Sequence, residues 1–194
     1  MRCIGIAGGI SLHAQDDSYI SYFNSPFIGH RRSSSIDVYP SDGTWGSHAF
    51  SPTDGKITEI RTISMGKKKV FPSSQYDYAI GIVPEGVEDA IVRILHCKPG
   101  ISVGDSISRG DFIGSLVRSR YFCFWTGPHY HIEAMNPKHF ARPSQSFPII
   151  SNVGGIQVHK GTSSSKFECE VVRSTKDIVV CASREYSYAK SGPF

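Results

Sequence analysis

The chain has 194 residues, 39% of them hydrophobic and 20% charged, with a formal net charge of +4. This length suits one domain, or one domain with an appendage, and it provides enough apolar residues for a core. The charge is mild and its clearest basic cluster is limited to the lysines at 67–69, whereas a nucleic-acid-binding protein needs a broad basic stripe. We therefore expect no nucleic-acid partner.

The start of the chain has an apolar run, within residues 1–10, that is too short for a secretion signal or a membrane span. The 5 cysteines have no Cys-x-x-Cys spacing, which argues against a zinc ribbon or a thioredoxin-like centre. Reduced thiols are typical of cytosolic proteins, so we expect a cytoplasmic protein that does not bind a membrane. Cys169 and Cys181 could still face each other across a hairpin.

The 19 glycines, the 11 prolines and many short β-branched runs predict an all-β fold of short antiparallel strands joined by turns. A strand near the start is followed by a polar stretch over 11–18. Further strands are expected at 36–38, 56–63, 78–83, 90–96 and 129–133. Gly-Asp pairs at 104–105 and 110–111 predict two successive turns of a compact β-corner.

Asp37 lies in a predicted strand between Ile36 and Val38, where aspartate is disfavoured. If the carboxylate points inward, it needs a cation, a hydrogen-bond donor or a metal as its partner. If it lies on the solvent face of an edge strand, it needs none.

The run 127–133 carries His129, His131 and Glu133 two residues apart in a segment rich in aromatic and β-branched residues. Alternate side chains of a strand share one face, so these three are expected to lie together. Two imidazoles and a neighbouring carboxylate make half a zinc site with a supporting partner. The alternative is a polar sheet face that happens to carry two histidines.

The chain divides within a Pro-rich exit over residues 136–150. We expect a core over residues 1–137 and a C-terminal β-rich extension over 138–194. In the extension, residues 167–173 and 177–183 are predicted to pair as a hairpin across 174–176. This extension carries no acid–base constellation, so we expect it to pack on the core or to mediate contacts.

Residues 30–133 resemble the lysostaphin/LytM-type zinc endopeptidases, which share the duplicated-hybrid-motif β fold. The segments that carry the resemblance, in order, are 35–38 with 50–57, 94–96 with 103–114, and 126–133. The last reads Thr-Gly-Pro-His-Tyr-His-Ile-Glu, close to the family's Thr-Gly-Pro-His-Leu-His-Phe-Glu. Each motif is weak alone, but their order makes the set specific.

The resemblance implies a zinc-dependent peptidase or amidase that binds Zn²⁺ through His30, Asp37 and His131. His129 and His96 would flank the open coordination position as acid–base and oxyanion groups, with Glu133 orienting an imidazole. The substrate would be a peptide, with Gly-rich and cell-wall peptides as examples from the family.

One spacing departs from the family, in which a histidine stands four residues before the aspartate. Ser33 occupies that place here, and His30 lies seven residues before Asp37. A longer loop could bring His30 to the metal at little cost in free energy. His48 is the reserve candidate for the first ligand.

Two non-catalytic functions remain open on the same architecture. A biotinyl or lipoyl carrier would use a lysine at a hairpin tip, for which Lys67 beside Met65 is the nearest candidate, and a phosphocarrier would use a histidine pair such as His96 and His129. An inactive structural relative would keep the groove to bind a partner. The oligomeric state is not indicated by the sequence.

Overall fold

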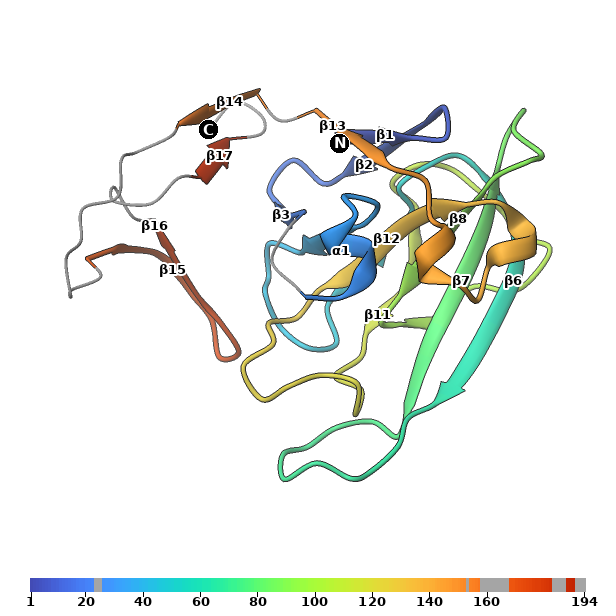
Figure 1. The fold of residues 1–194 in the computed structure, drawn as a ribbon. Helices are drawn as coiled ribbons and strands as arrows, with labels where there is room; N and C mark the ends of the chain where they lie inside the picture. The colour runs from blue at the N-terminus through green and yellow to red at the C-terminus, as the bar shows by residue number, and fades with distance from the viewer. Residues whose placement is uncertain (23–25, 153, 158–167, 183–187, 191–194) are drawn as a thin grey trace.

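The central strands form one antiparallel sheet of seven, in the order β10-β6-β7-β8-β12-β4-β3 (Figure 1). The computed structural model describes residues 1–22, 26–152, 154–157, 168–182 and 188–190. Two sheets of three strands, β13-β1-β2 and β5-β11-β9, pack against the large sheet, and two antiparallel strand pairs, β14-β17 and β15-β16, follow in the C-terminal part. The predicted mainly antiparallel β fold is therefore confirmed.

The strands of the core and the helical turns have the following bounds: β1 Arg2–Ala7, β2 Ile10–Ala14, β3 Tyr19–Ser21, α1 Ile28–Arg31, β4 Ile36–Tyr39, β5 His48–Phe50, β6 Gly55–Ser64, β7 Tyr76–Pro84, β8 Ile91–Leu95, β9 Cys97–Pro99, β10 Ser106–Ile107, β11 Phe112–Leu116, β12 Tyr130–Met135, η1 Pro137–His139 and η2 Pro143–Gln145. The later strands are β13 Ile149–Ser151, β14 Gly154–Gln157, β15 Glu170–Ser174, β16 Val179–Ala182 and β17 Tyr188–Lys190. Among the described residues, no helix has the length and apolar character needed to cross a membrane.

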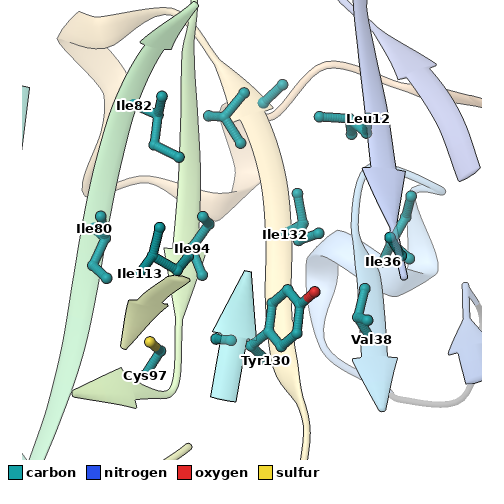
Figure 2. Packing of buried hydrophobic residues seen from close by; sticks show 14 of the residues in the cluster. Leu12, Ile36, Val38, Ile80, Ile82, Ile94, Cys97, Ile113, Tyr130 and Ile132 are labelled. Carbon is teal, nitrogen blue, oxygen red and sulfur yellow. The ribbon is translucent and has the colours of Figure 1, made fainter. Parts of the chain in front are cut away.

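The core lies between the large sheet and the two smaller ones. Figure 2 shows Ile80, Ile82 and Ile94 on one side and Leu12, Ile36 and Val38 on the other, with Tyr130 and Ile132 of β12 between them. These alternate residues of each strand point to the same side, as the period of a strand requires. The opposite face of β12 is left for His131 and Glu133, which are also buried.

The stretch after the first strand was expected to be merely polar, but Ile10–Ala14 forms β2, because Ile10, Leu12 and Ala14 alternate with the polar residues and pack in the core. The predicted β-corner contains two similar turns, in which Asp105 and Asp111 accept backbone hydrogen bonds from Ser102 and Ser108 at 2.8 and 2.7 Å.

The segment after residue 137 contacts the core closely. β13 pairs with β1, and the amide of Phe147 donates to the carbonyl of Ala134 at 2.7 Å. The division at 137/138 stays a prediction. The predicted hairpin is present as β15 and β16, although its outermost predicted residues, Phe167 and Ser183, lie outside the described part of the chain.

Cys169 and Cys181 lie near each other on the stem of this hairpin, where Val171 is the register partner of Cys181. Both thiols are free and exposed. A hydrogen bond between the two thiols raises the pKa of Cys169.

Candidate functional site

β12 and β4 bring the two strand-borne candidates of the site together. His131 and Asp37 are direct register partners, and β12 lies between β4 and β8 inside the large sheet. All six residues of β12 are buried, so neither face of this strand meets water. A buried imidazole and a buried carboxylate are costly unless they find partners, which explains why they meet across the strands.

His30 reaches the same place from a short helical turn. Residues 28–31 form α1, and Ser33 takes a left-handed φ of 53° that reverses the chain before β4. This turn takes up the extra residues between His30 and Asp37, and Nε2 of His30 lies 3.2 Å from Oδ1 of Asp37. The longer spacing is thus compatible with a shared site.

The three side chains form a compact donor set. One potential ligand atom from each of His30, Asp37 and His131 lies within 4.8 Å of the others. Ligand atoms of a tetrahedral zinc with bonds of about 2.0–2.1 Å lie about 3.3 Å apart, so small adjustments would suffice to hold an ion. Two imidazoles and one carboxylate are also ligands that zinc commonly takes.

The hydrogen bonds of His30 and His131 decide which nitrogen of each ring is available to a cation. Nδ1 of His30 donates to the carbonyl of Tyr22 at 2.9 Å, so Nε2 is the nitrogen that faces Asp37. Nε2 of His131 lies 2.8 Å from Oε1 of Glu133, and its Nδ1 lies 2.7 Å from Oδ1 of Asp37. Lone pairs that converge on an ionised carboxylate need a cation, either protons or a metal ion, between them.

The charges of the cluster agree with this geometry. Burial opposes ionisation of Asp37, but the neighbouring His129, His131 and His30 hold its pKa well below the usual range. Burial alone would lower the pKa of His131, but the hydrogen bonds and charges of Asp37 and Glu133 raise it to about 10 in the metal-free chain. The site is therefore built to hold positive charge.

Glu133 is supported by its own partners. Burial opposes its charge, yet His131 and Arg93 lower the pKa of Glu133 to about 2. Arg93 of β8 forms a buried ion pair with Oε2 and also donates to the carbonyl of Phe140, and the hydroxyl of Ser146 donates to Oε2 at 3.0 Å. Glu133 is thus fixed as the acceptor for Nε2–H of His131, which leaves Nδ1 for a metal.

His129 precedes β12 and lies on the same side as His131. Its Nδ1 donates to the carbonyl of Gly127 at 2.8 Å, and its Nε2 lies 3.6 Å from Oδ2 of Asp37. Burial lowers the pKa of His129 to about 4, against the attraction of Asp37. The ring is therefore neutral near pH 7, with an unprotonated Nε2 facing the cluster.

His96 approaches from the end of β8 and has a carboxylate of its own. It adopts a φ of 70°, rare for a residue other than glycine, and its Nδ1 lies 2.8 Å from Oδ2 of Asp77. Ser119 donates to the same oxygen at 2.7 Å. Burial opposes the charge of Asp77, but hydrogen bonds from His96, Ser119 and the amide of Tyr78 lower its pKa.

Aromatic rings surround His96 and His129. The ring of Phe122 lies 4.6 Å from that of His96 and 5.3 Å from that of His129, centroid to centroid. Tyr121 stacks on His96 at 5.2 Å, and Tyr39 lies 5.1 Å from His129. These rings keep water from the two imidazoles and account for the dominance of burial at His129.

His48, the reserve ligand, does not join the cluster. It is exposed on β5, where its ring packs edge-on against Phe112 at 4.8 Å. It lines a cavity of about 370 Å³ together with Asp17, Asp42 and Tyr130. The four catalytic and metal-binding imidazoles proposed from the sequence do not line this cavity.

Asp77, Ser119, Arg93 and Ser146 were not foreseen from the sequence. Two of them carry a signal that could have found them, because Asp77 and Arg93 are charged residues inside apolar strands, like Asp37. The serines carry no such signal. The structure brings together every sequence-predicted site residue except the reserve His48, while their catalytic and metal-binding roles stay predictions.

Solved structures with a similar fold include several peptidases. The catalytic domain of the prophage-encoded M23 protein EnpA from Enterococcus faecalis is 17% identical, with a TM-score of 0.48 over 74% of this chain and 97% of that chain. The M23 metalloprotease pseudoalterin, from the deep sea, is 14% identical over 100% and 98%, with a TM-score of 0.47. Lysostaphin, an antimicrobial peptidase from Staphylococcus simulans, is 16% identical over 92% and 80%, with a TM-score of 0.45.

At these identities and scores the likeness assigns no residue roles to this chain. No curated protein matches the sequence. A family model described as the N-terminal domain of a domain of unknown function, DUF8155, matches residues 11–151, which include all the residues of the cluster. The chain therefore belongs to the DUF8155 family.

Proposed function

We propose that this chain is a zinc-dependent peptidase or amidase, in which His30, Asp37 and His131 hold the metal. One observation carries the proposal. Ring nitrogens of His30, His131 and His129 converge on the single buried carboxylate of Asp37, while the other nitrogen of each ring already has a hydrogen-bond partner. A divalent cation held by His30, Asp37 and His131 satisfies the nitrogens of these two rings and the carboxylate at once, and leaves Nε2 of His129 unprotonated beside it.

Zinc held by three protein ligands keeps a fourth position for water, lowers the pKa of that water and polarises a carbonyl oxygen. The chain's own residues would supply the proton transfers. His129 would accept a proton at Nε2, because Nδ1 is committed to Gly127 and the ring is neutral at pH 7. It would then return this proton to the leaving amine.

His96 would act on the other side of the reacting carbonyl. Asp77 and Ser119 fix the ring through Nδ1, which leaves Nε2 to donate to the developing oxyanion or to position the water. The rings of His96 and His129 are 5.5 Å apart, close enough for both to reach one small group. Glu133, held by Arg93, would keep His131 in the tautomer that ligates through Nδ1.

The proposed substrate is a peptide, and Gly-rich and cell-wall peptides are the first to test because of the motif resemblance. A cytoplasmic location remains part of this proposal. An intracellular enzyme would meet such peptides only after their uptake or during their synthesis.

The test combines elemental analysis with a pair of histidine variants. We expect about one zinc per purified or zinc-reconstituted chain. Replacing His129→Ala should lower the hydrolysis rate about 10²–10⁴-fold, the range for a general acid–base group, while zinc is retained. The matched control is His48→Ala, which changes an exposed histidine outside the cluster and should leave the rate unchanged.

A chain that takes up no zinc on reconstitution would contradict the proposal. A chain that binds zinc but hydrolyses neither class of peptide would be an inactive relative that uses the site for binding. Equal rates for His129→Ala and the parent protein would remove His129 from the mechanism.

A further inference from the structure

The hairpin β15–β16 lies beyond the residues matched by the family model, yet its tip contacts the region of the site. Figure 1 shows the hairpin extending toward the loop that precedes β12. The tip, residues 175–178, makes its contacts with residues 43–45 and with Gly127. Gly127 precedes the tip by about fifty residues of chain, and residues 43–45 precede it by more than a hundred.

Two hydrogen bonds attach the tip to the loop before β5. The hydroxyl of Thr175 donates to the carbonyl of Gly43 at 2.8 Å, and Oδ2 of Asp177 accepts from the amide of Trp45 at 3.1 Å. Gly43 has a left-handed φ of 55°, and a β-carbon there would lie 3.1 Å from Thr175 and 3.2 Å from Ile178. The tip and this loop are therefore in close contact.

Ile178 makes the second attachment. A β-carbon added to Gly127 would lie 3.0 Å from Cγ2 of Ile178 and 3.4 Å from the ring of Tyr39. The Ile178 side chain thus packs against the backbone of Gly127, at a place where only glycine fits without displacement. The carbonyl of this same glycine accepts the hydrogen bond from Nδ1 of His129.

Both attachments lead to His129. Ile178 packs against Gly127, whose carbonyl accepts the proton on Nδ1 of His129 and so fixes the tautomer of this ring. Asp177 binds the amide of Trp45, whose ring lies 5.1 Å from that of Phe122, and Phe122 packs against both His129 and His96. The tip thus contacts Gly127, which accepts the hydrogen bond from His129, and Trp45, which packs on Phe122 next to His129.

The tip is internally ordered enough to serve as a support. The amide of Thr175 donates to the carbonyl of Ile178 at 2.8 Å, and the amides of Asp177 and Ile178 donate to the hydroxyl of Thr175 at 3.2 and 3.1 Å. Three hydrogen bonds within four residues fix the turn, so the position of Ile178 is fixed relative to the two strands of the hairpin.

We propose that residues 175–178 are a positioning element for His129, which brace the Gly127 segment from the C-terminal extension. The catalytic part of this inference rests on the proposed function, whereas the brace itself does not. It gives the extension a role within the site, in place of mere attachment to the core.

The experiment uses the full chain with Ile178→Ala and Thr175→Val, each with and without zinc. Val179→Ala is the matched control, because this residue is exposed and belongs to the same hairpin but lies outside residues 175–178. Hydrogen exchange of the amides of Thr126, Gly127 and His129 should become about fivefold faster in the two test variants and stay unchanged in the control. Zinc affinity should stay within about twofold of the parent, since the metal ligands are not touched.

Where the parent hydrolyses peptide, the test variants should lower kcat about tenfold with KM nearly unchanged, as expected for a misplaced proton-transfer group. Unchanged exchange at residues 126–129 would overturn the brace. A higher kcat in Ile178→Ala would also overturn it, because the hairpin would then restrain catalysis. Absence of hydrolysis in the parent would count against the proposed function alone, since the exchange measurement does not depend on it.

Discussion

His131 lies between two carboxylates, Asp37 and Glu133, whereas His129, two residues earlier, has a backbone carbonyl at one nitrogen and aromatic rings around it. Both rings are buried, but the pKa of His131 is raised to about 10 and that of His129 is lowered to about 4. Because burial lowers the pKa of both rings, the difference between them comes from the two carboxylates beside His131. Under the proposed function, this difference separates a metal ligand from a proton-transfer group. Four predictions test this division.

Replacing Asp37→Asn should have the largest effect, because it removes the carboxylate on which the ring nitrogens converge. We expect zinc affinity to fall more than about 100-fold, beyond the range for changes to groups that only orient a ligand. Competition with a chelator of known affinity measures the change, and circular dichroism controls for the fold. An affinity within tenfold of the parent would mean that the metal is held elsewhere.

The two supporting carboxylates should separate the two sides of the site. Glu133→Gln should weaken zinc binding about 10–100-fold, since it supports a metal ligand. Asp77→Asn should leave zinc affinity unchanged but lower kcat, by up to about 100-fold, because it disorients His96. Calorimetry and a hydrolysis assay on both variants form the comparison. If Glu133→Gln and Asp77→Asn both weaken zinc binding, or both change only kcat, the proposed division between the metal-binding side and the His96 side is wrong.

The third prediction concerns pH. Because the pKa of His131 is raised to about 10, zinc must displace a proton from this ring even at pH 8, where a histidine with the ordinary value of 6.5 has none to lose. Apparent zinc affinity should therefore rise about tenfold per pH unit from 7 to 9. Calorimetry at pH 8, in two buffers of different ionisation enthalpy, should detect about one proton released per zinc.

The same raised pKa stabilises the zinc-free folded chain. This contribution is complete below pH 6.5 and is lost as the pH rises through about 10, because the folded state then no longer binds the extra proton. The zinc-free protein should thus have a lower Tm at pH 9 than at pH 7. A Tm that is higher at pH 9, with no proton released on zinc binding, would mean that the pKa of His131 is not raised.

The sequence was sufficient for the strands that carry the site, because their side-chain alternation is local. The spacing of His129, His131 and Glu133 indicated one shared face, and the structure has it. For Asp37 the local pattern left a buried and a solvent-exposed position open, and the structure buries it beside His131. Asp77 and Arg93 show the same signal of a charge inside an apolar strand. Their partners are set by strand order, which the local pattern does not contain.

The contacts of the hairpin tip were beyond prediction for a related reason. Asp177 and Trp45 are separated by 132 residues, and neither has an unusual local environment in the sequence. The turn around His30 was similarly hidden, because its helical geometry depends on Ser33 adopting a left-handed φ. Spacing alone could keep His30 as a candidate but could not decide how it would reach Asp37.

β13 has a consequence for where this chain can be shortened. Its residues complete the sheet of β1, and the amide of Ile149 donates to the carbonyl of Ser33 at 2.7 Å, next to the turn that presents His30. Trimming the chain at residue 137 would remove this strand, together with Phe140 and Ser146, which hold Arg93 and Glu133. A minimal excised unit that keeps His30, Asp37, His131 and Glu133 in place therefore extends at least through Ser151, and such a unit would lack the hairpin tip that we propose to brace His129.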